Sequence, residues 1–141
     1  MMLYLDTSLL VAALTNEAST SRVQDWLGRQ AAGDLGISDW VVTEFSAALA
    51  VKLRTGQITA GNRADVLANF TRMMTESFLV VPVLSRHFRA AARLTDQHGL
   101  GLRAGDALHL AICADHAATL CTLDRRLGQA GDAVSVLTTS P

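Results

Sequence analysis

The sequence predicts an α/β fold in which a central, mostly parallel sheet is flanked by helices. Short apolar runs bounded by polar residues recur along the chain, which is typical of buried strands in a parallel sheet. Segments with apolar residues at helical spacing separate these runs, and this alternation favours parallel strands joined by crossover helices. At 141 residues the chain is long enough to bury a core, and we expect residues 1–141 to form a single domain.

The first predicted strand is the apolar run Met1–Leu5, which leads directly into Asp6. Thr7 and Ser8 follow, and their hydroxyls can cap the helix predicted for Leu9–Thr15. Glycines, prolines and hydroxyl residues mark the limits of the later elements. Further helices are predicted to begin at Ser19 or Thr20, at Ser38 or Asp39, at Thr59, at Ser85 and at Ala104. Further strands are predicted over Leu35–Ile37, Phe78–Val83, Thr119–Leu123 and Ala133–Leu137, with a loop at Gly99–Gly101.

Four acidic residues stand alone among apolar neighbours. Asp6 and Asp124 each follow a predicted strand, whereas Glu44 and Asp106 lie in helical segments that hold no other acid. An ionised carboxylate in apolar surroundings is costly unless it is paired or bound to a metal. Open α/β sheets place their ligands beyond the carboxyl ends of the strands, so Asp6 and Asp124 are expected at a ligand site.

Each of the four acids also has a separate structural explanation. Asp6 could cap the first helix, and Asp124 could cap a turn over Arg125–Leu127. Glu44 could pair with an arginine, and Asp106 could be a first-turn acid that the helix dipole favours. A shared explanation is a bound cation, because carboxylates within a few ångströms of one another repel unless a cation holds them. Oxygen ligands favour Mg²⁺ or Mn²⁺ over zinc.

Short segments around these acids resemble a known family. They are Asp6-Thr-Ser, Val-Val-Thr-Glu44-Phe, Arg103-Ala-Gly-Asp-Ala-Leu-His-Leu-Ala and Thr122-Leu-Asp. In these segments, and in length and element order, the chain resembles a PIN domain and, within that class, the VapC toxins of bacterial toxin–antitoxin pairs. The resemblance implies a PIN-like three-layer fold with a central, mostly parallel sheet flanked by helices.

The resemblance also implies a function. The expected activity is that of a metal-dependent endoribonuclease, the toxin of a type II toxin–antitoxin system, which hydrolyses RNA phosphodiester bonds. Asp6, Glu44, Asp106 and Asp124 are the implied catalytic and metal-binding residues, with Mg²⁺ or Mn²⁺ as the ion. Asp124 could bind this ion directly or through water. The implied partners are an RNA substrate, a cognate antitoxin and a second copy of the chain.

Other functions remain open or are disfavoured by single residues. A catalytically weak PIN-like binding module and a nuclease on single-stranded DNA are both compatible with the pattern. An aspartyl-phosphate phosphatase needs a second aspartate two positions after Asp6, where this chain has Ser8. A receiver domain needs a lysine near a late strand, but the only lysine is Lys52, in a predicted helix.

Several polar residues near the acids are candidates for support or substrate contact. Thr7, Ser8 and Thr122 could donate hydrogen bonds to the carboxylates, although cap and strand positions also explain them. Arg103 could contact a phosphate or lie on the surface. His109 is expected to pack or to support the site rather than to bind the ion. The other histidines show no zinc spacing: His87, His98 and His116.

The composition indicates how the protein could bind nucleic acid and protein partners. The net charge is −1, so no global basic field attracts nucleic acid. Eleven of the twelve basic residues are arginine, which suits bidentate contacts with phosphate. Three arginines recur at helical spacing: Arg86, Arg89 and Arg93. They could follow an RNA backbone or form a helix face that is exposed to solvent. Half of the residues are apolar, and one predicted helix has apolar residues all around it: Trp40, Val41, Phe45 and Leu49. We therefore expect helices near the N-terminal half to offer a groove or a dimer face.

The expected location is the cytoplasm. No run approaches the ~18 apolar residues of a membrane span, and the N-terminus lacks the basic segment of a secretory signal. Cys113 and Cys121 lack the spacing of metal ligands, and two cysteines are too few for a disulfide scaffold. Both cysteines are therefore expected to be reduced core residues.

Overall fold

The computed structural model, which describes residues 1–141, is built around a sheet of five strands in the order β3-β2-β1-β4-β5. Every neighbouring pair of strands is parallel, so the sheet is entirely rather than mostly parallel. The predicted α/β class is confirmed. The strands are β1 (Leu3–Leu5), β2 (Leu35–Ser38), β3 (Leu79–Val81), β4 (Thr119–Cys121) and β5 (Thr138–Thr139).

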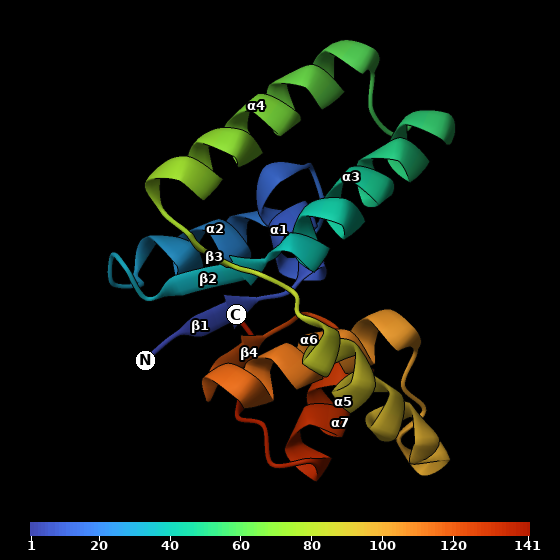
Figure 1. Cartoon of the computed structure of the whole chain (residues 1–141). Coiled ribbons are helices and arrows are strands. Elements are labelled where there is room, and N and C mark those ends of the chain that lie inside the picture. Colours follow the sequence, from blue (N-terminus) through green and yellow to red (C-terminus); the bar gives the residue numbers. More distant parts are fainter.

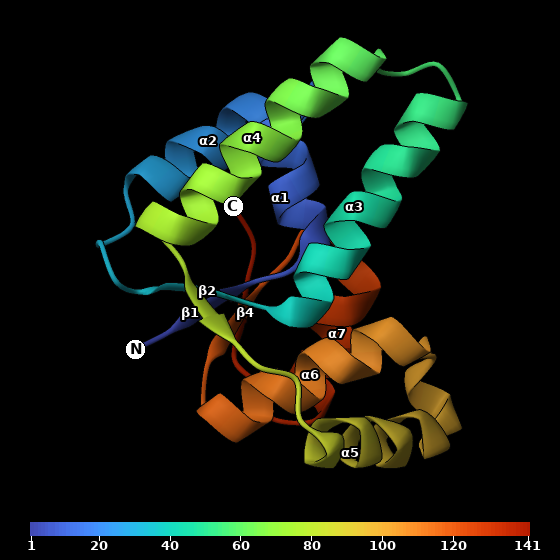
Figure 2. The ribbon, with the colours of Figure 1, turned by 45° about the horizontal axis from the view of Figure 1, so that its top comes forward.

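Helices cover both faces of the sheet and complete a three-layer arrangement (Figure 1). One group comprises α1 (Thr7–Leu14), α2 (Thr20–Gly28), α3 (Asp39–Arg54) and α4 (Ala60–Glu76). The other group comprises α5 (Ser85–Asp96), α6 (Ala104–His116) and α7 (Arg125–Ala133). Figure 2 shows α3 and α4 as an antiparallel pair that extends beyond the sheet. None of these helices combines the length and apolar character needed to cross a membrane.

The core forms because β1, the central strand, is buried between both helical layers. Leu3 pairs with Leu35 on one side, and Leu5 pairs with Cys121 on the other. The core cluster contains 28 buried apolar residues. Cys121 is free and buried, as is Cys113, in agreement with the predicted core positions. Burial raises the pKa of the Cys121 thiol to about 12, so it is not a reactive thiolate at neutral pH.

The apolar side of α3 faces this chain's own core. Val41, Phe45 and Leu49 are fully buried, and the Phe45 ring packs on Phe70 of α4. These three side chains are therefore not available for the expected groove or dimer face. Helical spacing gives the apolar stripe of α3, but only the tertiary structure shows that α4 covers it.

Several helix starts differ from the predictions because other side chains take the capping role. Asp6, not Thr7 or Ser8, caps α1, and its carboxylate accepts a hydrogen bond from the Leu9 N–H. Leu84, not Ser85, precedes α5, and its N–H donates to Nδ1 of His87 at 3.0 Å. Within the predicted loop, a short 3₁₀ turn over His98–Leu100 ends at Gly101, whose φ is +65°.

The C-terminal segment was predicted as a strand over Ala133–Leu137, and this prediction is wrong. Helix α7 ends at Ala133, residues 134–137 form a turn and irregular backbone, and β5 begins only at Thr138. Asp124 starts the helix because its Oδ1 accepts hydrogen bonds from the Arg126 and Leu127 N–H groups. A helix was missed here because only a short turn was expected after Asp124.

Candidate active site

Three of the four predicted acids line one pocket of about 320 Å³ beyond the carboxyl ends of β1 and β4. Glu44 comes from α3, Asp106 from the first turn of α6, and Asp124 from the residue that caps α7. Two arginines, Arg103 and Arg126, line the same pocket. The fold therefore brings together acids from three elements that are far apart in the sequence.

Asp6 does not line this pocket, because it is buried behind it with only 3% exposure. Its carboxylate accepts hydrogen bonds from the hydroxyls of Ser8 and Thr122. The Thr122 hydroxyl in turn accepts a hydrogen bond of 3.0 Å from the Asp124 N–H. Burial raises the pKa of Asp6, and the Thr122 and Ser8 hydrogen bonds oppose that rise. Thr122 thus ties Asp6 to the pocket residue Asp124.

Glu44 is held by a chain of hydrogen bonds that runs back into the core. Its Oε1 accepts a hydrogen bond of 2.7 Å from Thr7 and also contacts Nε2 of His109. Nδ1 of His109 lies 2.7 Å from the hydroxyl of Tyr4, which lies 2.8 Å from the Ser38 hydroxyl. His109 is 2% exposed, in agreement with a packed, supporting histidine. The glutamate thus pairs with a histidine, not with the arginine that was one alternative.

The charge of Glu44 is stabilised by this network. Burial alone would raise the pKa of Glu44, but the hydrogen bond and charge of His109 and the hydrogen bond from Thr7 leave it below its ordinary value. Glu44 therefore presents an ionised carboxylate to the pocket, with its second oxygen free of hydrogen bonds from the protein.

Asp106 has no hydrogen bond or ion pair to balance its charge. Burial raises its pKa, and the negative charges of Asp124 and Glu44 raise it further. Asp124 keeps one oxygen in the cap of α7, so capping and a place in the pocket are not alternatives for this residue. No arginine or lysine forms an ion pair with any of these acids. Arg103 and Arg126 line the pocket without pairing with these acids, and the only basic side chain that pairs with one of them is His109, at Glu44.

The donor set of this pocket suits a hard divalent cation. Carboxylate oxygens are the ligands that Mg²⁺ and Mn²⁺ prefer, and no cysteine lines the pocket. No three of the predicted acids place carboxylate oxygens within 4.8 Å of one another. The acids of this pocket are therefore more widely spaced than the ligands of a compact metal site. Glu44, Asp106 and Asp124 would hold the ion across the pocket, and Thr122 joins Asp6, the fourth predicted ligand, to Asp124.

Gly105 is a pocket residue that the sequence did not single out. A Cβ at this position would lie 3.0 Å from Oε2 of Glu44 and 3.3 Å from Nε1 of Trp40. Any side chain here would press on the free oxygen of Glu44. The closeness follows from how α6 packs against α3, which no local pattern in the sequence reveals.

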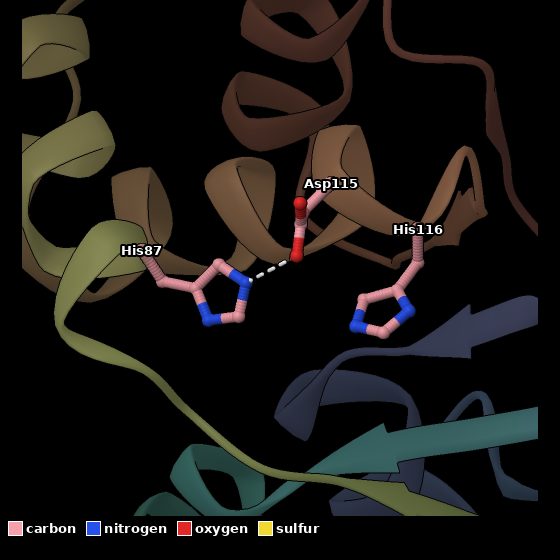
Figure 3. Close-up of side chains that lie close together, drawn as sticks. All are labelled: His87, Asp115 and His116. Atoms are coloured by element: carbon pink, nitrogen blue, oxygen red, sulfur yellow. Dashed lines mark hydrogen bonds and ion pairs between the residues drawn. The ribbon is translucent and has the colours of Figure 1, made fainter.

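A second cluster of possible ligands, His87, Asp115 and His116, lies between α5 and α6 (Figure 3). Nδ1 of His87 accepts the Leu84 N–H, so the ring proton is on Nε2, which donates to Asp115 at 2.8 Å. The same carboxylate oxygen of Asp115 accepts a hydrogen bond of 2.8 Å from Arg86. A metal at Nε2 would require this nitrogen to lose its proton and the Leu84 bond to break. The cluster is therefore better explained as a clamp between two helices than as a metal site.

This clamp gives a pH-dependent prediction. Hydrogen bonds from Arg86 and His87 hold the pKa of Asp115 at about 2. Because this value is below that of an unfolded aspartate, about 4, the stabilisation is present at neutral pH and lost as the pH falls from about 4 to 2. Replacing Asp115 with Asn should lower the melting temperature at pH 7, and the difference should disappear near pH 2. The exposed, unpaired Asp65 provides the control Asp65→Asn, for which a similar pH-dependent difference would contradict the assignment.

Comparisons with known proteins place the fold in a family. The PIN domain model matches residues 3–133. The structure resembles FitAcB from Neisseria gonorrhoeae (21% identity, TM-score 0.71, covering 97% of this chain and 96% of that one). It also resembles VapC20 of Mycobacterium tuberculosis, a sarcin-ricin loop cleaving toxin (17% identity, TM-score 0.75, covering 92% and 95%).

A third similar structure is VapBC2 from Rickettsia felis, bound to a DNA fragment from its promoter (16% identity, TM-score 0.69, covering 100% and 99%). No curated protein matches the chain in sequence. At these identities the likeness to solved structures establishes the fold, and the family match extends over nearly all of the chain. The protein therefore belongs to the PIN-domain family.

Proposed function

We propose that the protein is a metal-dependent endoribonuclease that serves as the toxin of a type II toxin–antitoxin system in the cytoplasm. The observation that carries the proposal is the pocket in which Glu44, Asp106 and Asp124 meet while no arginine or lysine pairs with any of them. VapC20, one of the similar structures, is a toxin that cleaves the sarcin-ricin loop, which supports RNA as the substrate.

The residues of the pocket can perform phosphodiester hydrolysis. A bound Mg²⁺ or Mn²⁺ would supply an acidified water as the nucleophile and neutralise charge on the phosphate. Glu44, Asp106 and Asp124 would hold the ion together with Asp6, the fourth predicted ligand. The Thr7 and His109 contacts keep the Glu44 carboxylate in place. Asp106 has no hydrogen bond in the protein and is free to accept the proton released on attack. Arg103 and Arg126 line the pocket where they can contact a phosphate of the bound strand.

The proposed protein partners are a cognate antitoxin and a second copy of the chain. Similar structures include toxin–antitoxin complexes, among them VapBC2 on its promoter DNA, which supports an antitoxin partner. Large apolar side chains are exposed on β3 and just before α5, where Leu79, Val80 and Leu84 are 57%, 36% and 37% exposed. We expect copies of the chain to associate, and a protein that sediments as a monomer at high concentration would contradict the homodimer.

One experiment separates the proposed function from its alternatives. Purified protein is incubated with pooled RNA and with single-stranded DNA, in Mn²⁺ and in EDTA, and the new ends are mapped. The proposal expects RNA cleavage in Mn²⁺ that EDTA abolishes. Cleavage of DNA alone would identify a DNA nuclease. Failure to cleave either substrate, together with antitoxin binding, would identify a binding module.

Replacing Gly105 with Ala tests the geometry of the pocket. The added methyl group would displace the free Glu44 oxygen, because the two would lie 3.0 Å apart. We expect RNA cleavage to fall by roughly 10-fold to 100-fold, since small displacements of catalytic groups have effects of this size. The melting temperature should not fall comparably, because Ala is the better helix former.

The matched control for this variant is Gly61→Ala. Gly61 is the second residue of α4, as Gly105 is of α6, and a Cβ there meets only the Thr59 hydroxyl oxygen at 3.9 Å. The control should cleave RNA like the parent. Equal cleavage by both alanine variants would show that Gly105 does not set the position of Glu44.

A further inference from the structure

A second pocket, of about 290 Å³, adjoins the carboxylate pocket. Trp40 and Gly105 line both, so the two pockets share a wall. The other walls of the second pocket come mainly from α5 and α6, with Phe88, Ala91 and Leu108 among them. A ligand that occupied both pockets would therefore pass directly over the indole of Trp40.

The chemistry of this second pocket differs sharply from that of the first. No charged side chain lines it, and its larger walls are the aromatic rings of Trp40 and Phe88. Phe88 is 55% exposed, an unusual position for an aromatic ring. Nε1 of Trp40 is the one buried side-chain nitrogen or oxygen without a hydrogen-bond partner. Such a pocket fits a flat, uncharged aromatic group, and it offers nothing to a phosphate.

We propose that this pocket binds a nucleobase of the substrate strand beside the phosphate that is cut, with Trp40 and Phe88 as its stacking surfaces. The inference rests on the proposed function and extends it to sequence preference. Trp40 lies one helical turn before Glu44 on α3, and Gly105 directly precedes Asp106 on α6. A base on the indole therefore brings its own phosphate to the carboxylates.

The shared wall favours a nucleobase over a protein side chain as the occupant. A nucleic acid strand carries a planar base and a phosphate a few bonds apart, and the two neighbouring pockets offer an aromatic slot and a cation-binding site in that arrangement. An apolar protein segment would fill the slot but would have no use for the carboxylates beside it.

The test uses Phe88→Ala, because removal of an exposed ring leaves the core intact. The chain has two tryptophans, so a Trp26→Phe background makes Trp40 the only fluorescent indole. The probes are RNA hexanucleotides of each base in Ca²⁺, which binds to carboxylates, and the length of each probe is checked after the titration. We expect these probes to quench Trp40, with a dissociation constant about 5-fold to 100-fold weaker for Phe88→Ala. Leu137→Ala, also an exposed apolar side chain at 64%, should bind like the parent.

A series of hexanucleotides, each lacking the base at one position, shows which nucleotide of the probe occupies the pocket. In the parent, removal of the base at one position should weaken binding. In Phe88→Ala, removal of the same base should weaken binding no further, because the ring that contacts it is already absent. The subsite is overturned if Phe88→Ala binds and cleaves like the parent, or if every position responds equally. It is also overturned if Phe88→Ala keeps its affinity for the probes but loses affinity for the antitoxin. Parent protein that binds the probes but cleaves no RNA would contradict the proposed function while leaving the subsite standing.

Discussion

Replacing Asp106 with Asn should abolish RNA cleavage without lowering the melting temperature in EDTA. Asp106 has no hydrogen-bond partner, and burial together with the charges of Asp124 and Glu44 raises its pKa. A raised pKa means that the ionised carboxylate opposes folding at neutral pH, so the neutral amide should be at least as stable. Cleavage should fall by about 100-fold or more, because the variant binds the ion poorly.

Metal binding gives the second half of this result. Mg²⁺ should raise the melting temperature of the parent more than that of Asp106→Asn, because an ion that binds only the folded state stabilises it by mass action. Asp39→Asn is the control, since Asp39 is a first-turn acid of α3 as Asp106 is of α6. A structural Asp106 predicts instead a loss of roughly 1 kcal/mol in EDTA. A destabilised variant that still cleaves RNA would remove Asp106 from the site.

Replacing Thr122 with Val should impair both folding and activity. The Thr122 hydroxyl donates to the buried carboxylate of Asp6 and accepts from the Asp124 N–H. Valine keeps the shape of the side chain but leaves both groups without this partner, which should cost about 1–3 kcal/mol of unfolding free energy. Metal affinity should fall by about 10-fold to 100-fold, as for other residues that orient metal ligands. Chemical denaturation and metal titration measure the two effects.

Thr119→Val is the matched control for this substitution. Thr119 begins β4, the strand that ends directly before Thr122, and its hydroxyl contacts only the Met1 sulfur at 3.6 Å. The control should differ little from the parent in stability and metal affinity. If both valine variants behave alike, the hydroxyl of Thr122 does not connect Asp6 to Asp124.

The apolar pattern determined the elements well where strands and helices are bounded by polar residues. Three elements lie close to their predicted positions: β1, which leads into Asp6, β2 and α3. The spacing of apolar residues that predicts these elements can be seen within a short stretch of the sequence. The last strand was displaced because Asp124 caps a helix there. A capping aspartate and a site aspartate look the same in the sequence, and here Asp124 is both in the cap and in the pocket.

The sequence by itself determined the class of fold, the family resemblance and which acids are candidates, because isolated carboxylates in apolar segments are visible without coordinates. Only the tertiary structure decided that Asp6 lies behind the pocket rather than in it. It also decided that His109 holds Glu44 and that Phe88 and Trp40 line one pocket. These pairings join side chains from different elements, and their distances depend on how the helices pack on the sheet, which local residue patterns do not encode.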